Sequence, residues 1–141
     1  MREKGKTIQA GVIGWPVEHS LSPRLHGYWL KKHGIDGTYV PMAVTPDGFE
    51  NFLANLCDQG ITGVNITVPH KEAALKAVTV VDEKARRIGS VNTIRVEETG
   101  ELHGSNTDGF GFMENLKEGA PEWTLDLGPV TVLGAGGAAR A

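Results

Sequence analysis

Several short polar strings lie between apolar stretches of the chain, and their side chains could bind a small ligand. The strings span residues 18–22, 65–71, 89–93 and 104–111. Their candidate ligand-binding residues are Ser20, Ser22, Asn65, Thr67, Lys71, Asn92 and Asp108. Hydroxyls, amides and one ammonium–carboxylate pair suit an anionic ligand that carries several hydroxyl groups.

Each string also has a plain structural interpretation. Ser22 precedes a proline where a helix should begin, which is typical of an N-cap. Asn65 and Thr67 alternate onto one face of a strand end, and Lys71 could be a surface lysine. Residues 106–108 are typical of a turn followed by a cap. Both interpretations stay open for each string by itself.

A glycine-rich turn stands near the end of the sequence. Residues 130–133 are predicted to form a buried strand that runs into Gly134, Gly136 and Ala139, the pattern G-x-G-x-x-A. Such a turn can bring a helix N-terminus against a pyrophosphate, although a plain strand–helix turn is the alternative. The sequence stops at Ala141, before the ribose-reading residue expected about 20 positions later. We therefore expect a piece of a longer protein with an incomplete cofactor site.

The elements that must position these strings alternate along the chain. Strands are expected at residues 9–14, 38–44, 62–67, 91–96, 101–103 and 130–133, and helices begin near 22, 45, 70, 82 and 108. Pro41 cannot donate to a ladder, so its strand should lie at a sheet edge. Helical spacing of apolar residues is clearest at Phe49, Phe52, Leu53 and Leu56. The prediction is an α/β three-layer sandwich with a mixed, mainly parallel sheet and helices on both faces.

Composition excludes several classes of protein. The 141 residues carry a net charge of −3, without the basic footprint of a nucleic-acid binder. No apolar run approaches the roughly 20 residues that span a bilayer. The apolar stretch near the N-terminus is also shorter than the hydrophobic core of a secretory signal, so we expect a cytoplasmic protein. Cys57 is the single cysteine, and the histidines are scattered, so no metal is expected.

Five strings, taken together and in order, resemble the N-terminal part of the shikimate dehydrogenase family. They are residues 20–23, 65–71, 89–93, 106–109 and 134–137. The resemblance implies NADP-dependent, reversible reduction of 3-dehydroshikimate to shikimate in aromatic amino acid biosynthesis, on a sheet of about six strands. Ser90 departs from the family, which usually has alanine there.

The resemblance also implies a role for each candidate residue. Ser20 and Ser22 would hold the substrate carboxylate, and Asn65, Thr67, Asn92 and Asp108 would contact the ring hydroxyls. Lys71 would be the catalytic proton-transfer residue, with Asp108 as its partner. The cofactor contacts would be Glu83, Gly134, Ala135, Gly136, Gly137 and Ala138.

The resemblance predicts a substrate-binding domain over residues 1–120 and the truncated start of a Rossmann domain over 121–141. We expect shikimate or 3-dehydroshikimate as the small-molecule partner, with no nucleic acid or membrane, and a homodimer is possible. The chain by itself should be inactive. Two alternatives stay open: a quinate/shikimate dehydrogenase that uses NAD or NADP, and a non-catalytic sugar-acid-binding module.

Overall fold

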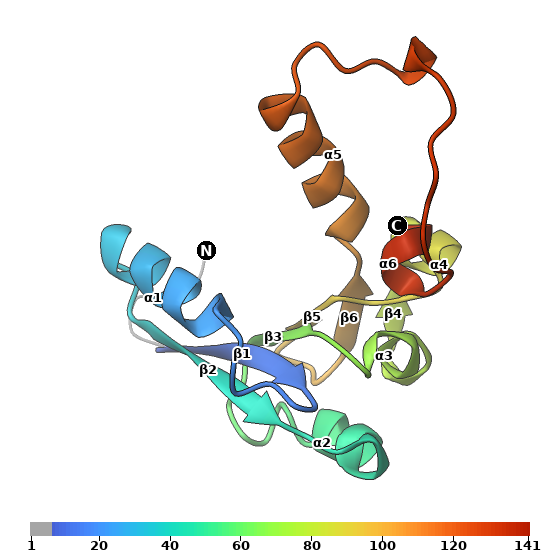
Figure 1. Cartoon of the computed structure of the whole chain (residues 1–141). Helices are drawn as coiled ribbons and strands as arrows, with labels where there is room; N and C mark the ends of the chain where they lie inside the picture. Colours follow the sequence, from blue (N-terminus) through green and yellow to red (C-terminus); the bar gives the residue numbers. More distant parts are fainter. Residues whose placement is uncertain (1–6) are drawn as a thin grey trace.

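A mixed β-sheet organises the chain in the computed structural model, which describes residues 7–141 (Figure 1). Within these residues the strands are β1 (Ile8–Gly14), β2 (Gly37–Ala43), β3 (Gly63–Ile66), β4 (Val80–Val81), β5 (Thr93–Val96) and β6 (Leu102–Ser105). Their order is β2-β1-β3-β5-β6-β4. Only β5 runs antiparallel to its neighbours, so the predicted mixed, mainly parallel sheet is confirmed. Pro41 lies in the edge strand β2, as expected.

Helices flank the sheet on both faces. They are α1 (Ser22–Lys32), α2 (Phe49–Ala54), α3 (Lys71–Ala77), α4 (Glu83–Ile88), α5 (Asp108–Gly119) and α6 (Gly137–Arg140), with single 3-10 turns at Pro46–Gly48 and Leu125–Leu127. In Figure 1, α1 lies over one face of β1 and β2, and α2 lies on the opposite face, in contact with α3. None of the helices within residues 7–141 combines the length and the apolar character needed to cross a bilayer.

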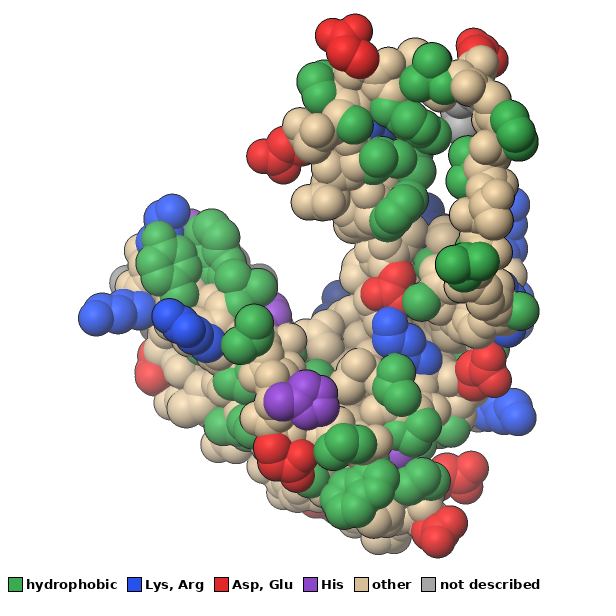
Figure 2. All heavy atoms as spheres, in the orientation of Figure 1, with side chains coloured by type: hydrophobic (Ala, Val, Ile, Leu, Met, Phe, Trp, Pro, Cys, Tyr) green, Lys and Arg blue, Asp and Glu red, His purple; other side chains and the backbone are tan. Residues whose placement is uncertain are grey.

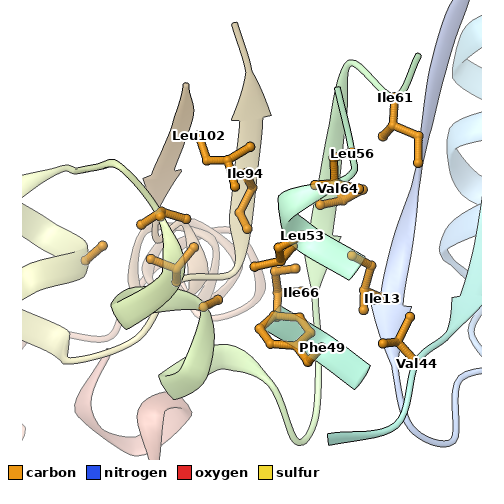
Figure 3. Close-up of a cluster of buried hydrophobic side chains, with 14 residues drawn as sticks. Ile13, Val44, Phe49, Leu53, Leu56, Ile61, Val64, Ile66, Ile94 and Leu102 are labelled. Carbon is orange, nitrogen blue, oxygen red and sulfur yellow. The ribbon is translucent and has the colours of Figure 1, made fainter. Parts of the chain in front are cut away.

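The hydrophobic core lies on the α2 face of the sheet. Phe49, Leu53 and Leu56, from the helical pattern in the sequence, are at most 1% exposed and face Ile13 and Ile66 of the sheet (Figure 3). The main stabilising contribution of α2 is the burial of Phe49 and Leu53 against the strands, and Leu56 extends this packing just beyond the end of the helix.

Strand β3 directs polar side chains to the other face of the sheet. Val64 and Ile66 are buried in the core, and side chains alternate along a strand, so Asn65 and Thr67 point to the face that α1 partly covers. One strand therefore serves both the core and the candidate site.

The strand predicted at residues 130–133 is wrong. This segment has no regular structure, and Val130, Val132 and Leu133 are 70%, 60% and 93% exposed. Its β-branched residues favour a strand, but a strand needs a ladder partner, and no strand among residues 7–141 pairs with it. Conversely, the two-residue strand β4 was not predicted, because two residues carry no readable pattern.

Candidate functional site

An ion pair joins the two candidate proton-transfer residues. Lys71 is the first residue of α3 and Asp108 the first of α5, 37 positions later. The Lys71 Nζ donates to Asp108 Oδ2 at 2.6 Å, and the two side chains are 22% and 27% exposed. The pair is therefore held together, and it remains open to a ligand.

Asn92 orients the Asp108 carboxylate through a hydrogen bond to the oxygen that Lys71 does not contact. The backbone N–H of Thr107 donates to one end of the Asn92 amide at 3.1 Å, which identifies that end as the carbonyl oxygen Oδ1. The Nδ2 end then donates to Asp108 Oδ1 at 2.8 Å. Both Asp108 oxygens thus have a donor, which fixes the plane of the carboxylate.

Buried hydrogen bonds of Asn106 fix the start of α5. Asn106 is 5% exposed, and its Nδ2 donates to the Ser90 Oγ at 3.0 Å, while its Oδ1 accepts from the Asp108 backbone N–H at 2.9 Å. Ser90, the departure from the family pattern, is fully buried in this contact. Sequence analysis noted Ser90 only as a departure from the family and did not include Asn106 among the candidate site residues, whereas the structure shows that both support Asp108.

The two candidate serines and Thr67 line a cavity near the start of α1. Ser20, Ser22 and Thr67 surround a cavity of about 340 Å³, together with Trp15 and His19. The N-cap interpretation of Ser22 is wrong, because α1 begins at Ser22 after Leu21 and no side chain caps it. Its hydroxyl is therefore not used as a helix cap.

Asn65 connects the ion pair and its Asn92 partner to the group formed by the two serines and Thr67. It precedes Thr67 by two residues on the same face of β3, a spacing of roughly 7 Å. Its Nδ2 donates to Thr93 Oγ1 at 3.1 Å, and Thr93 Oγ1 lies 2.9 Å from Asn92 Oδ1. Figure 2 shows the molecule hollowed on this side, between α1 and α5. The structure thus places Ser20, Ser22, Asn65, Thr67, Lys71, Asn92 and Asp108 along one face of the sheet.

Tyr39 of β2 contacts the candidate site residue Asn65, and the sequence analysis did not identify it. Its hydroxyl donates to Asn65 Oδ1 at 2.7 Å, and its ring stacks on His26 of α1, with centroids 4.1 Å apart. Burial raises the pKa of Tyr39 to about 12, so its hydroxyl keeps its proton at neutral pH. No local motif could have indicated this residue, because the contact depends on the register across three strands.

The raised pKa of Tyr39 can be measured directly. We expect tyrosinate absorbance in a Tyr28→Phe variant, where Tyr39 is the remaining tyrosine, to rise with a midpoint near pH 12. Since the folded pKa exceeds the unfolded value of about 10, the associated stability is complete below pH 10 and is lost as pH rises toward 12. A midpoint near pH 10 in the folded chain would refute this assignment.

The candidate cofactor residues lie in two separate places, at the start of α4 and in the glycine turn before α6. Glu83 lies exposed in the first turn of α4, and the described residues give it no ion pair. Gly134 has a φ of 115°, which favours glycine, and a Cβ on Gly137 would lie 2.6 Å from Ser90 Oγ. The glycine turn therefore packs directly against the segment that supports Asp108.

Arg140 anchors this turn to the rest of the molecule. Its guanidinium donates to the Ile88 carbonyl at 2.8 Å and to Glu72 Oε1 at 2.7 Å. Glu72 directly follows Lys71 in α3, so α6 contacts the helix that carries the ion pair. Arg140 thus connects the α6 turn to α3 and α4, whereas the preceding residues 130–133 are exposed.

Comparison with known proteins identifies close relatives. A family model described as the shikimate dehydrogenase substrate binding domain matches residues 12–94. A shikimate dehydrogenase (NADP(+)) from Rhodospirillum rubrum is 61% identical over 137 residues, which are 97% of this chain and 48% of that protein. Another from Paramagnetospirillum magneticum is 56% identical, covering 97% of this chain and 50% of that protein.

A solved structure shows the same fold. The crystal structure of shikimate 5-dehydrogenase from Thermus thermophilus, in complex with NADP(H) and shikimate, has a TM-score of 0.87 and 42% sequence identity. The match covers 95% of this chain and 49% of that one. The chain spans about half the length of the curated relatives it matches. Since the family model covers more than half of this chain, the chain belongs to the shikimate dehydrogenase substrate-binding domain family.

Proposed function

We propose that this chain is the substrate-binding part of an NADP-dependent shikimate dehydrogenase, which reversibly reduces 3-dehydroshikimate to shikimate. The observation that carries the proposal is the Lys71–Asp108 ion pair of 2.6 Å, oriented by Asn92 on a face that also holds Ser20, Ser22 and Thr67. A pure binding module has no need of an oriented ammonium–carboxylate pair. The names of the relatives support the same reaction.

Each side chain has a role in this reaction. The two serine hydroxyls hold the substrate carboxylate, and Asn65, Thr67 and Asn92 bind ring hydroxyls through their amide and hydroxyl groups. NADP supplies or accepts the hydride when it is bound. During reduction the carbonyl oxygen gains negative charge, and the Lys71 ammonium, held by Asp108, donates a proton to it.

The reverse reaction makes a further demand on Lys71. In shikimate oxidation the same amine accepts the hydroxyl proton, so it must be deprotonated before the substrate reacts. Asp108, 2.6 Å away, holds the amine in position for this step.

The glycine turn fits the pyrophosphate of the cofactor. A Cβ on Gly136 would meet nothing within 4 Å, so backbone is accessible there, and the positive φ of Gly134 permits the tight turn. Gly134, Ala135, Gly136, Gly137 and Ala138 would hold the pyrophosphate, with Glu83 a weaker candidate for a cofactor contact. We place the domain boundary near residue 120, where α5 ends, and the reaction in the cytoplasm.

An assay of a defined fusion tests the proposal. This chain joined at Ala141 to the remaining half of the Rhodospirillum rubrum relative, here called the fusion, should oxidise shikimate with NADP, whereas the chain alone should not. Faster turnover of quinate than of shikimate would favour the quinate/shikimate class, because the substrate-binding loops come from this chain. Shikimate binding without turnover in a folded fusion would favour the non-catalytic binding module.

A further inference from the structure

A row of hydrogen bonds joins the edge strand β2 to Asp108, and each bond in the row is donated toward Asp108. Because Asn92 Oδ1 is identified by the Thr107 N–H, its neighbour Thr93 Oγ1 at 2.9 Å must donate to it. A threonine hydroxyl has one proton, so Thr93 can only accept from its remaining partner. The atom of Asn65 that faces it at 3.1 Å is therefore Nδ2.

The hydrogen bond at the edge strand β2 is donated in the same direction. With Nδ2 of Asn65 facing Thr93, its Oδ1 faces the Tyr39 hydroxyl, which must donate across the 2.7 Å contact. The second proton of Nδ2 lies on the side of the Asn92 carbonyl, and the Nδ2 atom is 3.4 Å from that oxygen. Tyr39 is thus the first donor in a row of hydrogen bonds that ends on the Asp108 carboxylate, which also accepts from Lys71.

We infer that Tyr39 is a positioning residue for substrate recognition, because its hydroxyl clamps the oxygen end of the Asn65 amide. The inference rests on the proposed function, in which Asn65 contacts a ring hydroxyl. In the clamped orientation both N–H groups of Asn65 face protein acceptors, and Oδ1 keeps a second lone pair. Asn65 is then set to accept a hydrogen bond from a substrate hydroxyl rather than to donate one.

The surroundings of Tyr39 keep this clamp in place. The ring stacks on His26 at an interplanar angle of 10°, which fixes its direction. A cavity of about 280 Å³ between α1 and the sheet is lined by Tyr39, His26, Asn65 and Thr93. Without the Tyr39 hydroxyl, Asn65 would be held only at its nitrogen and could swing into that space.

The test compares two tyrosine-to-phenylalanine variants of this chain. Tyr39→Phe should weaken shikimate binding roughly three- to tenfold by calorimetry, the value of one net hydrogen bond. Tyr28→Phe removes the same atom from an exposed side chain of α1 and should bind like the wild type. In NMR spectra, the side-chain amide signals of Asn65 should move in Tyr39→Phe and stay in place in Tyr28→Phe.

Thr93→Val removes both the acceptor for Asn65 Nδ2 and the donor to Asn92 Oδ1, so it should weaken shikimate binding at least as much as Tyr39→Phe. If Tyr39→Phe fails to fold, Tyr39→Leu, which also lacks the hydroxyl, is measured in its place. Wild-type-like affinity together with unmoved Asn65 signals in a folded Tyr39→Phe variant would overturn the inference. If the wild-type chain does not bind shikimate, the proposed function fails, and the Asn65 signals still decide whether Tyr39 holds the amide.

Discussion

Replacing Lys71 by alanine in the fusion is expected to lower kcat for shikimate oxidation about 10²- to 10⁴-fold, the range for loss of a general acid–base group. The KM for shikimate should change far less, because the serine hydroxyls and amides that bind the substrate remain. Steady-state kinetics at saturating NADP measures both constants. The expectation follows from the position of the Lys71 ammonium, oriented by Asp108 at 2.6 Å.

Lys76→Ala provides the matched control. Lys76 lies in the last turn of the same helix, α3, and is exposed, so it should leave kcat unchanged. Asp108→Asn should also lower kcat, because it removes the charge that holds the ammonium. Turnover of Lys71→Ala close to that of Lys76→Ala would end the proposed role of Lys71.

Replacing Phe49 by alanine should lower the free energy of unfolding of the chain by about 3–5 kcal/mol. The Phe49 ring is 1% exposed, and it stacks on the ring of His70 with centroids 4.4 Å apart. Its removal leaves a cavity between α2 and the residue that precedes Lys71. Urea unfolding followed by circular dichroism measures the change.

Phe112→Ala is the control for that change. Phe112 is 67% exposed in α5, so its truncation should alter stability by no more than about 0.5 kcal/mol. Equal effects of the two truncations would show that the core around α2 does not stabilise the fold as described.

The sequence predicted the elements that have strong local patterns. The helical spacing of Phe49, Leu53 and Leu56 predicted a helix packed on the core, which ends at Ala54, so that Leu56 lies just beyond it. The alternation along β3 correctly placed Asn65 and Thr67 on one face. Both results depend only on periodicity within a few residues. The strands expected at residues 91–96 and 101–103 are present as the antiparallel pair β5 and β6 for the same reason.

The parts that failed depend on distant contacts. Residues 130–133 have strand propensity, yet no partner strand lies beside them in residues 7–141. The contact of Tyr39 with Asn65 follows from β2 and β3 flanking β1, which no local pattern reveals. The meeting of Lys71 and Asp108 was expected only from the family resemblance and from the position of both at strand ends.

Titration of shikimate into the 141-residue chain, followed by NMR, tests the central claim most directly. The account predicts saturable shifts in the backbone signals of Ser22, Thr67 and Asp108 and in the side-chain amide of Asn92. Absence of saturable shifts, or shifts confined to the opposite face around Asn51 and Gln59, would contradict the account.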